Sequence, residues 1–417
     1  MGFSRITDFV WIVNKALLIL ALILSAFIII YDSVRKALDN RSQNRLENTK
    51  KLLRNLARSS KTPSKDTCSG IINRLTIKQI FDIVKSDEAA GSKEFKSHLT
   101  SCLEKAGKFD RLEKIASGSG RKWTRIQAIM TLGYCEIHSA LPILKDALLS
   151  KDSDISYFSM LALGQIKNNM SARILLDFLE KKMYSGYKIV SILESFPRTI
   201  VKEVVNKTGS SDPVARFWAV KLLTTFKPQD HADRIEELTR DESADVRAAS
   251  CEFLGELKNK RSLPPILQCL NDSAWFVRMR AVRALFSLLE KDCVSYIIGM
   301  LNDPSKFVKE SVKEVVIQDI ESYLPHIETC LLTGSEEAKK CCVDALVDSE
   351  YISQLLKSLL SEHPDKKERA TALLAALIRS DFYFGLKKVL DTFPGNDRKS
   401  ILEIIKSMDS GLEKRIR

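Results

Sequence analysis

One spacing dominates this sequence: an apolar helical stretch that ends in Leu or a similar residue returns about every 31 residues. We mark each stretch by the residue after that apolar end, beginning with Gly133 in IQAIMTLG. The marked position then recurs in steps of 30 or 31 residues, at Gly164, Glu194, Thr224, Gly255, Phe286, Ile317, Val347, Ile378 and Asp409. A fixed period of this length indicates a repeat protein, in which each unit packs mainly against its neighbours.

Each repeat has the pattern of two helices. One position before the mark is always apolar, as at Leu132, and four positions earlier the residue is often small, as at Ala128. Residues four apart share a helix face, so these columns predict a tightly packed second helix. Proline recurs 22 residues before the mark, at Pro142, Pro264 and Pro325. Proline is tolerated in the first turn of a helix, which predicts that a first helix begins there.

A column of cations recurs eight residues before the mark. Three members have an aspartate six residues upstream, which gives Asp241 with Arg247, Asp272 with Arg278, and Asp303 with Lys309. Aspartate can cap the start of a helix and pair with the stacked cations of adjacent repeats. We therefore interpret these residues as a structural ladder between repeats, in preference to a stripe that binds a ligand.

The residues around this ladder resemble a known repeat family. The segment 241–255, DESADVRAASCEFLG, resembles a HEAT repeat of the short, phycobilisome-lyase-like type, and AWFVRMRAVRALF at 274–286 is similar. The resemblance extends over 109–417 and about ten repeats, and it is strongest near 212–317. It implies an all-α fold, an α-solenoid of two-helix repeats whose long concave face binds other molecules.

An uncharged apolar run, ALLILALILSAFIIIY, occupies residues 16–31. Extended back to Phe9 it has 23 residues, which is about 35 Å of helix against a bilayer core of about 30 Å. A cleaved signal peptide has a shorter apolar stretch and a small-x-small cleavage site, whereas this run ends in FIIIYDS. We therefore predict one N-terminal transmembrane helix, in preference to a signal peptide or a buried helix.

A basic segment follows the apolar run. Residues 35–65 hold ten Lys and Arg against two acidic residues, in a chain of net charge +12. This excess places the body of the protein in the cytoplasm by the positive-inside rule, and nine cysteines without a CxxC pair agree with a reducing compartment. The cations set the topology, and some are also candidates for contact with anionic lipid. These candidates are Arg35, Lys36, Arg41, Arg45, Lys50 and Lys51.

The patterns divide the chain into four parts. We expect a transmembrane anchor at 1–32, a basic juxtamembrane helix or linker at 33–66, a helical capping region at 67–108 and the repeat solenoid at 109–417. Trp123 and Trp275 fall near the starts of second helices. Aromatic residues at such turns are candidates for contact with a partner, although they more often serve packing.

Catalytic motifs are missing from the sequence. It contains no HExxH, no GxGxxG and no phosphate-binding GxxxxGK[ST], and none of its five histidines precedes a glutamate. We therefore expect no catalytic activity, no cofactor and no metal site.

These patterns favour a membrane-anchored scaffold or adaptor that binds a protein partner at the cytoplasmic face. The layout resembles a bacterial group with one N-terminal transmembrane helix, a basic segment and short HEAT repeats, whose members accompany membrane glycosyltransferases. That resemblance implies an accessory factor for such an enzyme. Two alternatives remain open: a lyase or hydroxylase on a HEAT scaffold, and a binder of anionic lipid or nucleic acid through residues 35–65.

Overall fold

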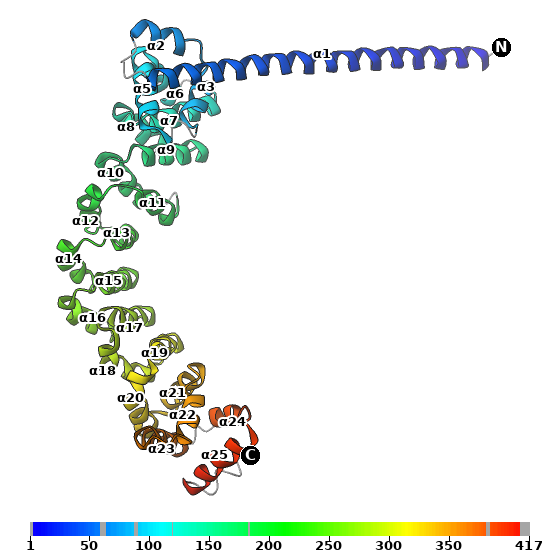
Figure 1. The fold of residues 1–417 in the computed structure, drawn as a ribbon. Coiled ribbons are helices and arrows are strands. Elements are labelled where there is room, and N and C mark those ends of the chain that lie inside the picture. Colours follow the sequence, from blue (N-terminus) through cyan, green and yellow to red (C-terminus); the bar gives the residue numbers. More distant parts are fainter. Residues whose placement is uncertain are drawn as a thin grey trace. The chain divides into compact units, whose positions relative to one another are not determined.

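The computed structural model describes residues 3–58, 64–86, 91–118, 120–181, 184–380 and 384–408. Side chains are described over the same ranges except at 3–14, 16, 19, 57, 58, 384 and 385. Over these residues the regular structure is helical, with α-helices joined by short 3-10 helices (Figure 1). The chain divides into two compact units, Met1–Ile174 and Leu175–Arg417.

The first unit contains one long helix and a set of short ones. These are α1 (Phe3–Arg58), α2 (Lys65–Ile72), α3 (Ile77–Val84), α5 (Lys93–Lys105), α6 (Lys108–Ala116), α7 (Lys122–Tyr134), η1 (His138–Ala140), α8 (Leu141–Leu148) and α9 (Ser153–Ile166). The next helix, α10 (Asn169–Phe178), crosses the division between the units.

Among the described side chains of α1, those near its C-terminal end pack against the rest of the first unit. Leu53 is fully buried in a core with residues of α2, α3 and α5, and Leu46 packs against the same core. Farther back along the helix the apolar side chains are exposed, with Leu17 57% and Phe27 65% accessible. Among the described residues, no helix is both long and apolar enough to cross a membrane. The anchor predicted at 1–32 includes residues 1–14, 16 and 19, whose side chains lie outside the description.

The second unit is a stack of helix pairs. Its α-helices are α11 (Gly186–Leu193), α12 (Val201–Lys207), α13 (Pro213–Phe226), α14 (Ala232–Leu238), α15 (Ala244–Leu257), α16 (Leu263–Cys269), α17 (Trp275–Leu289), α18 (Val294–Ile297), α19 (Lys306–Gln318), α20 (Ile320–Thr333), α21 (Glu336–Asp348), α22 (Tyr351–Leu359), α23 (Pro364–Arg379), α24 (Phe384–Leu390) and α25 (Gly395–Met408). Its 3-10 helices are η2 (Leu179–Lys181), η3 (Arg198–Ile200), η4 (Gln229–His231), η5 (Lys260–Ser262), η6 (Glu290–Cys293) and η7 (Ile298–Asn302).

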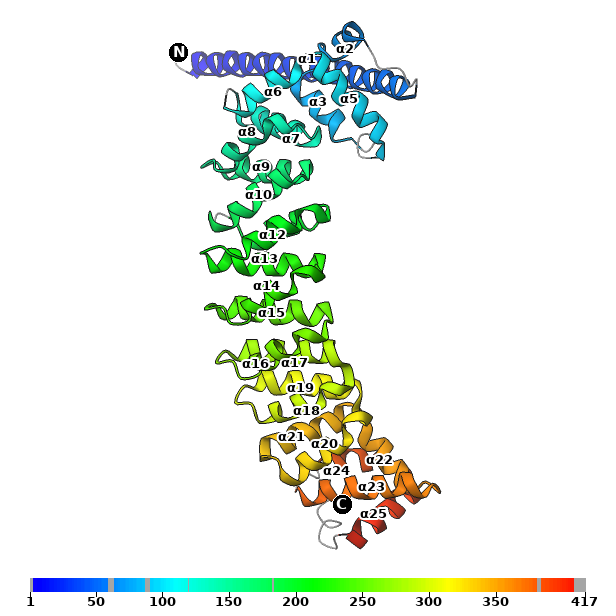
Figure 2. The same cartoon turned by 90° about the vertical axis from the view of Figure 1, so that its left-hand side faces the viewer.

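Two rows run through the second unit. The long helices α13, α15, α17, α19 and α21 each contact the next in the series, and they are the second helices of the repeats predicted from the sequence. Helices α12, α14, α16, α18 and α20 form the other row (Figures 1 and 2). The arrangement confirms the prediction of an all-α solenoid built from two-helix repeats.

The predicted packing columns form the core of these repeats. In the second unit the apolar column is buried from Leu193 to Leu377 and half-buried at Met408, and the small column is buried at Ser250 and Ala281. One detail of the prediction was wrong: Pro325 does not begin a first helix but lies inside α20, which starts at Ile320. The proline there removes one backbone hydrogen bond of that helix.

Glycine at the marked position lets neighbouring second helices touch. A Cβ atom added to Gly255 of α15 would lie 2.7 Å from the Cα atom of Ala284 in α17. In the first unit, a Cβ atom on Gly133 would lie 2.6 Å from the Cα atom of Ala162. Any side chain at these positions must push two backbones apart, so the glycines fix the closest approach between repeats.

This contact makes a prediction about stability. Gly255→Ala should lower the free energy of unfolding by about 1–3 kcal/mol, the usual effect of overpacking a tight contact. Thermal and urea denaturation of the purified protein measure the change. Gly299→Ala is the matched control, because a Cβ atom at Gly299 would meet nothing within 4 Å. An equal effect of both substitutions would contradict the role assigned to Gly255.

Candidate functional site

An arginine–aspartate ladder joins successive repeats of the second unit. Each arginine in the cation column binds the aspartate of the following repeat through two hydrogen bonds. The pairs are Arg216 with Asp241, Arg247 with Asp272, and Arg278 with Asp303, with nitrogen–oxygen distances of 2.6–2.8 Å. The predicted ladder residues therefore meet between repeats, and Arg216 joins them. Lys309 contacts Glu337, while Asp303 is held by Arg278.

Each ladder residue also organises the turn of its own repeat. The Arg247 guanidinium donates to the backbone carbonyl of Asp241 at 2.9 Å, while the Asp241 carboxylate accepts from the backbone N–H of Ser243 at 2.8 Å. The aspartate thus braces the turn before its own helix and holds the arginine of the preceding repeat. These contacts give the ladder a structural function and leave little of it exposed: the Arg247 side chain is 16% accessible and that of Asp272 9%.

The ladder lowers the pKa of its buried carboxylates. Burial would raise the pKa of Asp272, but the hydrogen bonds from Arg247 and from the Ala274 backbone outweigh it, so the pKa lies below its ordinary value of 3.8. The same balance, with Arg278 and the Ser305 backbone as donors, lowers the pKa of Asp303. Both groups are therefore ionised at neutral pH and keep their arginine partners.

An exposed aromatic stack lies at the N-terminal ends of α17 and α19. The rings of Trp275 and Phe307 lie 4.7 Å apart between centroids and are inclined by 27°. Trp275 is 40% accessible and Phe307 51%. Phe276 meets Trp275 edge-on at 5.8 Å, and the Lys306 ammonium lies 5.2 Å from the Phe307 centroid. Large aromatic surfaces that stay in contact with water are the usual anchors of protein interfaces.

Phe307 was missed by the sequence reasoning, although a signal existed. Phe276 and Phe307 occupy the same column, ten residues before the mark in consecutive repeats. Since consecutive second helices lie side by side, residues in one column are neighbours across the repeats. The other predicted aromatic contact, Trp123, lies in the first turn of α7 in the first unit and is 63% accessible.

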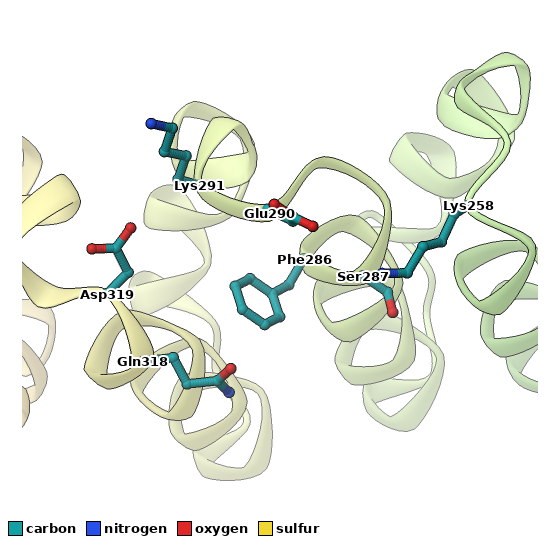
Figure 3. Close-up of a pocket in the computed structure, with 7 residues that line it drawn as sticks. All are labelled: Lys258, Phe286, Ser287, Glu290, Lys291, Gln318 and Asp319. Carbon is teal, nitrogen blue, oxygen red and sulfur yellow. The ribbon is translucent and has the colours of Figure 1, made fainter.

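A pocket opens at the opposite ends of α17 and α19. It has a volume of about 380 Å³ and is lined by Lys258, Phe286, Ser287, Glu290, Lys291, Gln318 and Asp319 (Figure 3). Phe286 occupies the marked position that is glycine at Gly255, and Figure 3 shows its ring directed away from α17 toward Gln318 of α19. We attribute the pocket to this ring, which prevents the close helix contact that glycine allows.

These two features belong to one strip, which we call the α17–α19 surface. It has the Trp275–Phe307 stack at one end, the Phe286 pocket at the other and a salt bridge of 2.8 Å from Arg283 to Glu314 between them. Helix α17 has 15 residues and is therefore about 22 Å long. An extended peptide of about six or seven residues has the same length.

The candidate lipid contacts lie along α1. Arg35, Lys36, Arg41, Arg45 and Lys51 are exposed, and Lys50 is half-buried. Lys36 pairs with Asp32 at 2.9 Å and Lys50 with Glu47 at 3.3 Å. The remaining exposed cations keep this part of α1 strongly basic.

Comparison with known proteins supports a HEAT-repeat protein. The family model described as HEAT repeats matches residues 201–286. No curated protein matches the chain in sequence. Among solved structures, unliganded Kap121p is 15% identical with a TM-score of 0.42, over 92% of this chain and 52% of its own. Kap121p bound to Pho4p is also 15% identical with a TM-score of 0.42, over 88% and 49%.

An engineered protein of solved structure is 14% identical with a TM-score of 0.30, over 87% of this chain and 98% of its own. The chain spans about half the length of Kap121p. These structural similarities, at 14–15% identity, do not identify a binding partner.

The ladder predicts a large stability effect from one substitution. Arg247→Met should lower the free energy of unfolding by about 2–4 kcal/mol, somewhat below the 3–5 kcal/mol of a fully buried pair because the side chains keep slight exposure. Urea denaturation at neutral pH measures the change. As a control, Arg283→Met removes the exposed Arg283–Glu314 pair and should change stability by about 0–1 kcal/mol. Equal effects would contradict the structural role of the ladder.

The same pair predicts a pH dependence. Because the pKa of Asp272 is lowered in the folded protein, its contribution to stability is complete above the ordinary value of about 4 and disappears as pH falls through the lowered pKa. Asp272→Asn should therefore destabilise the protein at pH 7 and flatten the fall of its melting temperature as the pH drops below about 4. An unchanged slope in the variant would show that Asp272 does not contribute.

Proposed function

We propose that the chain is a non-catalytic scaffold that binds a protein partner through the α17–α19 surface. The observation that carries the proposal is the exposed Trp275–Phe307 stack. A stacked pair loses little side-chain entropy on binding because each ring already restrains the other. The ladder holds α17 and α19 in fixed register beneath the stack, so a partner meets a preorganised surface.

The partner that fits this surface is an extended segment of another protein. A large apolar side chain of the segment would pack on the Trp275–Phe307 stack, and the main chain would follow the strip past Arg283 and Glu314. The far end would enter the pocket beside Phe286, where Lys258, Lys291, Glu290 and Asp319 offer charges of both signs. Because the pocket is not dominated by one charge, shape and apolar contact decide the affinity more than net charge does.

We further propose that the N-terminal part of α1 inserts into a membrane and leaves the rest of the chain on the cytoplasmic side. The large apolar side chains that the structure describes between Leu17 and Tyr31 are all exposed. Residues 17–31 alone cover about 22 Å, less than a bilayer core of about 30 Å. Insertion therefore requires the residues that precede them. The basic residues that follow favour the cytoplasmic side.

The finer proposal is that the partner is a membrane glycosyltransferase and that this chain is its accessory factor. An apolar N-terminal helix, a basic segment and HEAT-type repeats support it, since this layout is the one that resembles the bacterial group. An anchored scaffold raises the local concentration of its binding surface near a membrane enzyme, so a weak contact suffices for assembly.

The stack provides a direct test of the scaffold function. The full-length protein is purified from native membranes in mild detergent, copurifying proteins are identified by mass spectrometry, and the affinity of the stoichiometric partner is then titrated. Trp275→Ala and Phe307→Ala should each weaken binding about 30-fold or more, since interface anchors contribute about 2 kcal/mol or more. Tyr296→Ala is the matched control, because Tyr296 is 41% accessible but lies on α18 in the other row. Unchanged affinity in both stack variants would contradict the proposed surface.

The anchor has a separate test. The full-length protein should stay in the membrane fraction after both high salt and alkaline carbonate, whereas a chain lacking 1–32 should be released. Carbonate removes proteins held by surface charge and leaves inserted helices in place. Release of the full-length protein by carbonate would overturn insertion, and release by salt alone would assign membrane contact to the basic residues.

A further inference from the structure

A small pocket in the first unit combines two cations with an apolar wall. It lies between α3 and α6 and has a volume of about 40 Å³. Thr76, Ile77 and Ile80 contribute one side, and Lys108 and Arg111 contribute the other. A single water needs about 10–15 Å³ of such space, so the pocket admits a group of several heavy atoms.

The positive charge of this pocket is not neutralised by its lining. Lys108 and Arg111 are three residues apart on α6 and therefore share a helix face. Among the described residues that line the pocket none is acidic. Burial, and next the charge of Arg111, lower the pKa of Lys108. Lys108 is half-buried and Arg111 is exposed. An anion between these two adjacent cations would relieve their repulsion.

Helix α3, which forms one side of the pocket, also contacts the basic part of α1. Gln79 of α3 donates a hydrogen bond of 3.0 Å to the Ser42 hydroxyl of α1, which places the N-terminal turn of α3 against that helix. Arg41 and Arg45 lie on either side of Ser42 in sequence and are exposed. These cations add to the positive charge that an anion meets as it approaches the first unit.

We propose that the α3–α6 pocket binds a phosphate group, with Lys108 and Arg111 donating hydrogen bonds to its oxygens. The planar guanidinium of arginine matches two phosphate oxygens, and the lysine ammonium adds a compact charge. Ile77 and Ile80 provide an apolar wall for the organic side of a phosphate ester. Both a phospholipid headgroup and a soluble phosphate ester carry this chemistry.

The first experiment uses full-length protein in detergent and inorganic phosphate as the probe. Lysines are reductively methylated with ¹³C so that each ammonium gives an NMR signal, and the Lys108 signal is assigned from the Lys108→Gln variant. Phosphate at constant ionic strength should shift the Lys108 signal saturably and raise its pKa, whereas chloride should not. A Lys108 signal that responds equally to both salts would overturn the proposal.

Variants then test whether the pocket is the site. The double variant Lys108→Gln, Arg111→Gln should weaken phosphate binding about tenfold or more, since each charged hydrogen bond contributes more than a neutral one. Lys145→Gln is the control, because this exposed lysine of α8 removes the same charge from the first unit without lining the pocket. An equal loss of phosphate binding in the control would show a general effect of charge and would overturn the proposed site.

The source of the phosphate is distinguished by vesicles. Binding of the double variant and of the control is compared on vesicles of phosphatidylcholine with and without phosphatidic acid, with all basic residues of α1 retained. Selective loss of phosphatidic acid binding by the double variant assigns the pocket to a lipid headgroup. Loss of inorganic phosphate binding with unchanged vesicle binding assigns it to a soluble phosphate ester. Neither result depends on Trp275 or Phe307, so the test of the phosphate site is independent of the test of the scaffold function.

Discussion

The approach of neighbouring second helices governs the structure of the second unit. Gly255 permits backbone contact between α15 and α17, and the buried small residues Ser250 and Ala281 let the same helices interlock along their length. The arginine–aspartate pairs then fix the register, because each aspartate accepts a backbone N–H in the turn of one repeat while it binds the arginine of the repeat before it. Packing sets the distance and the ladder sets the alignment.

The α17–α19 surface lies where a large residue occupies the marked position. Phe286 stands where the preceding repeat has Gly255, and its ring lines the pocket at the C-terminal ends of α17 and α19. At the other end the ladder keeps the two helices close, and Trp275 and Phe307 stack across them. A repeat array can thus acquire a binding surface through a few substitutions, because the neighbouring repeats hold the substituted residues in place.

The sequence was sufficient for the parts of the fold that depend on local pattern. The period, the helix pairs and the buried columns all come from residues within one repeat, and the structure has them. Contacts between repeats were harder to predict: the sequence identified the column of cations and three aspartates, but the pairing of Arg216 with Asp241 and the order of the other pairs needed the geometry. Phe286 looked like one more variable residue at the mark, and the α3–α6 pocket joins residues that no motif connects. Whether the apolar residues of α1 lie in a membrane depends on the surroundings of the helix, which the fold alone does not fix.

The central claim, that the α17–α19 surface holds a protein partner, is tested most directly by site-specific photo-crosslinking in native membranes. A photoreactive phenylalanine analogue is placed at position 307, and in a separate protein at position 296 on the other row. The account predicts one dominant crosslinked protein from position 307, lost when Trp275 is also changed to alanine, and none of that protein from position 296. Crosslinking of the same protein from both positions, or from 296 alone, would contradict it.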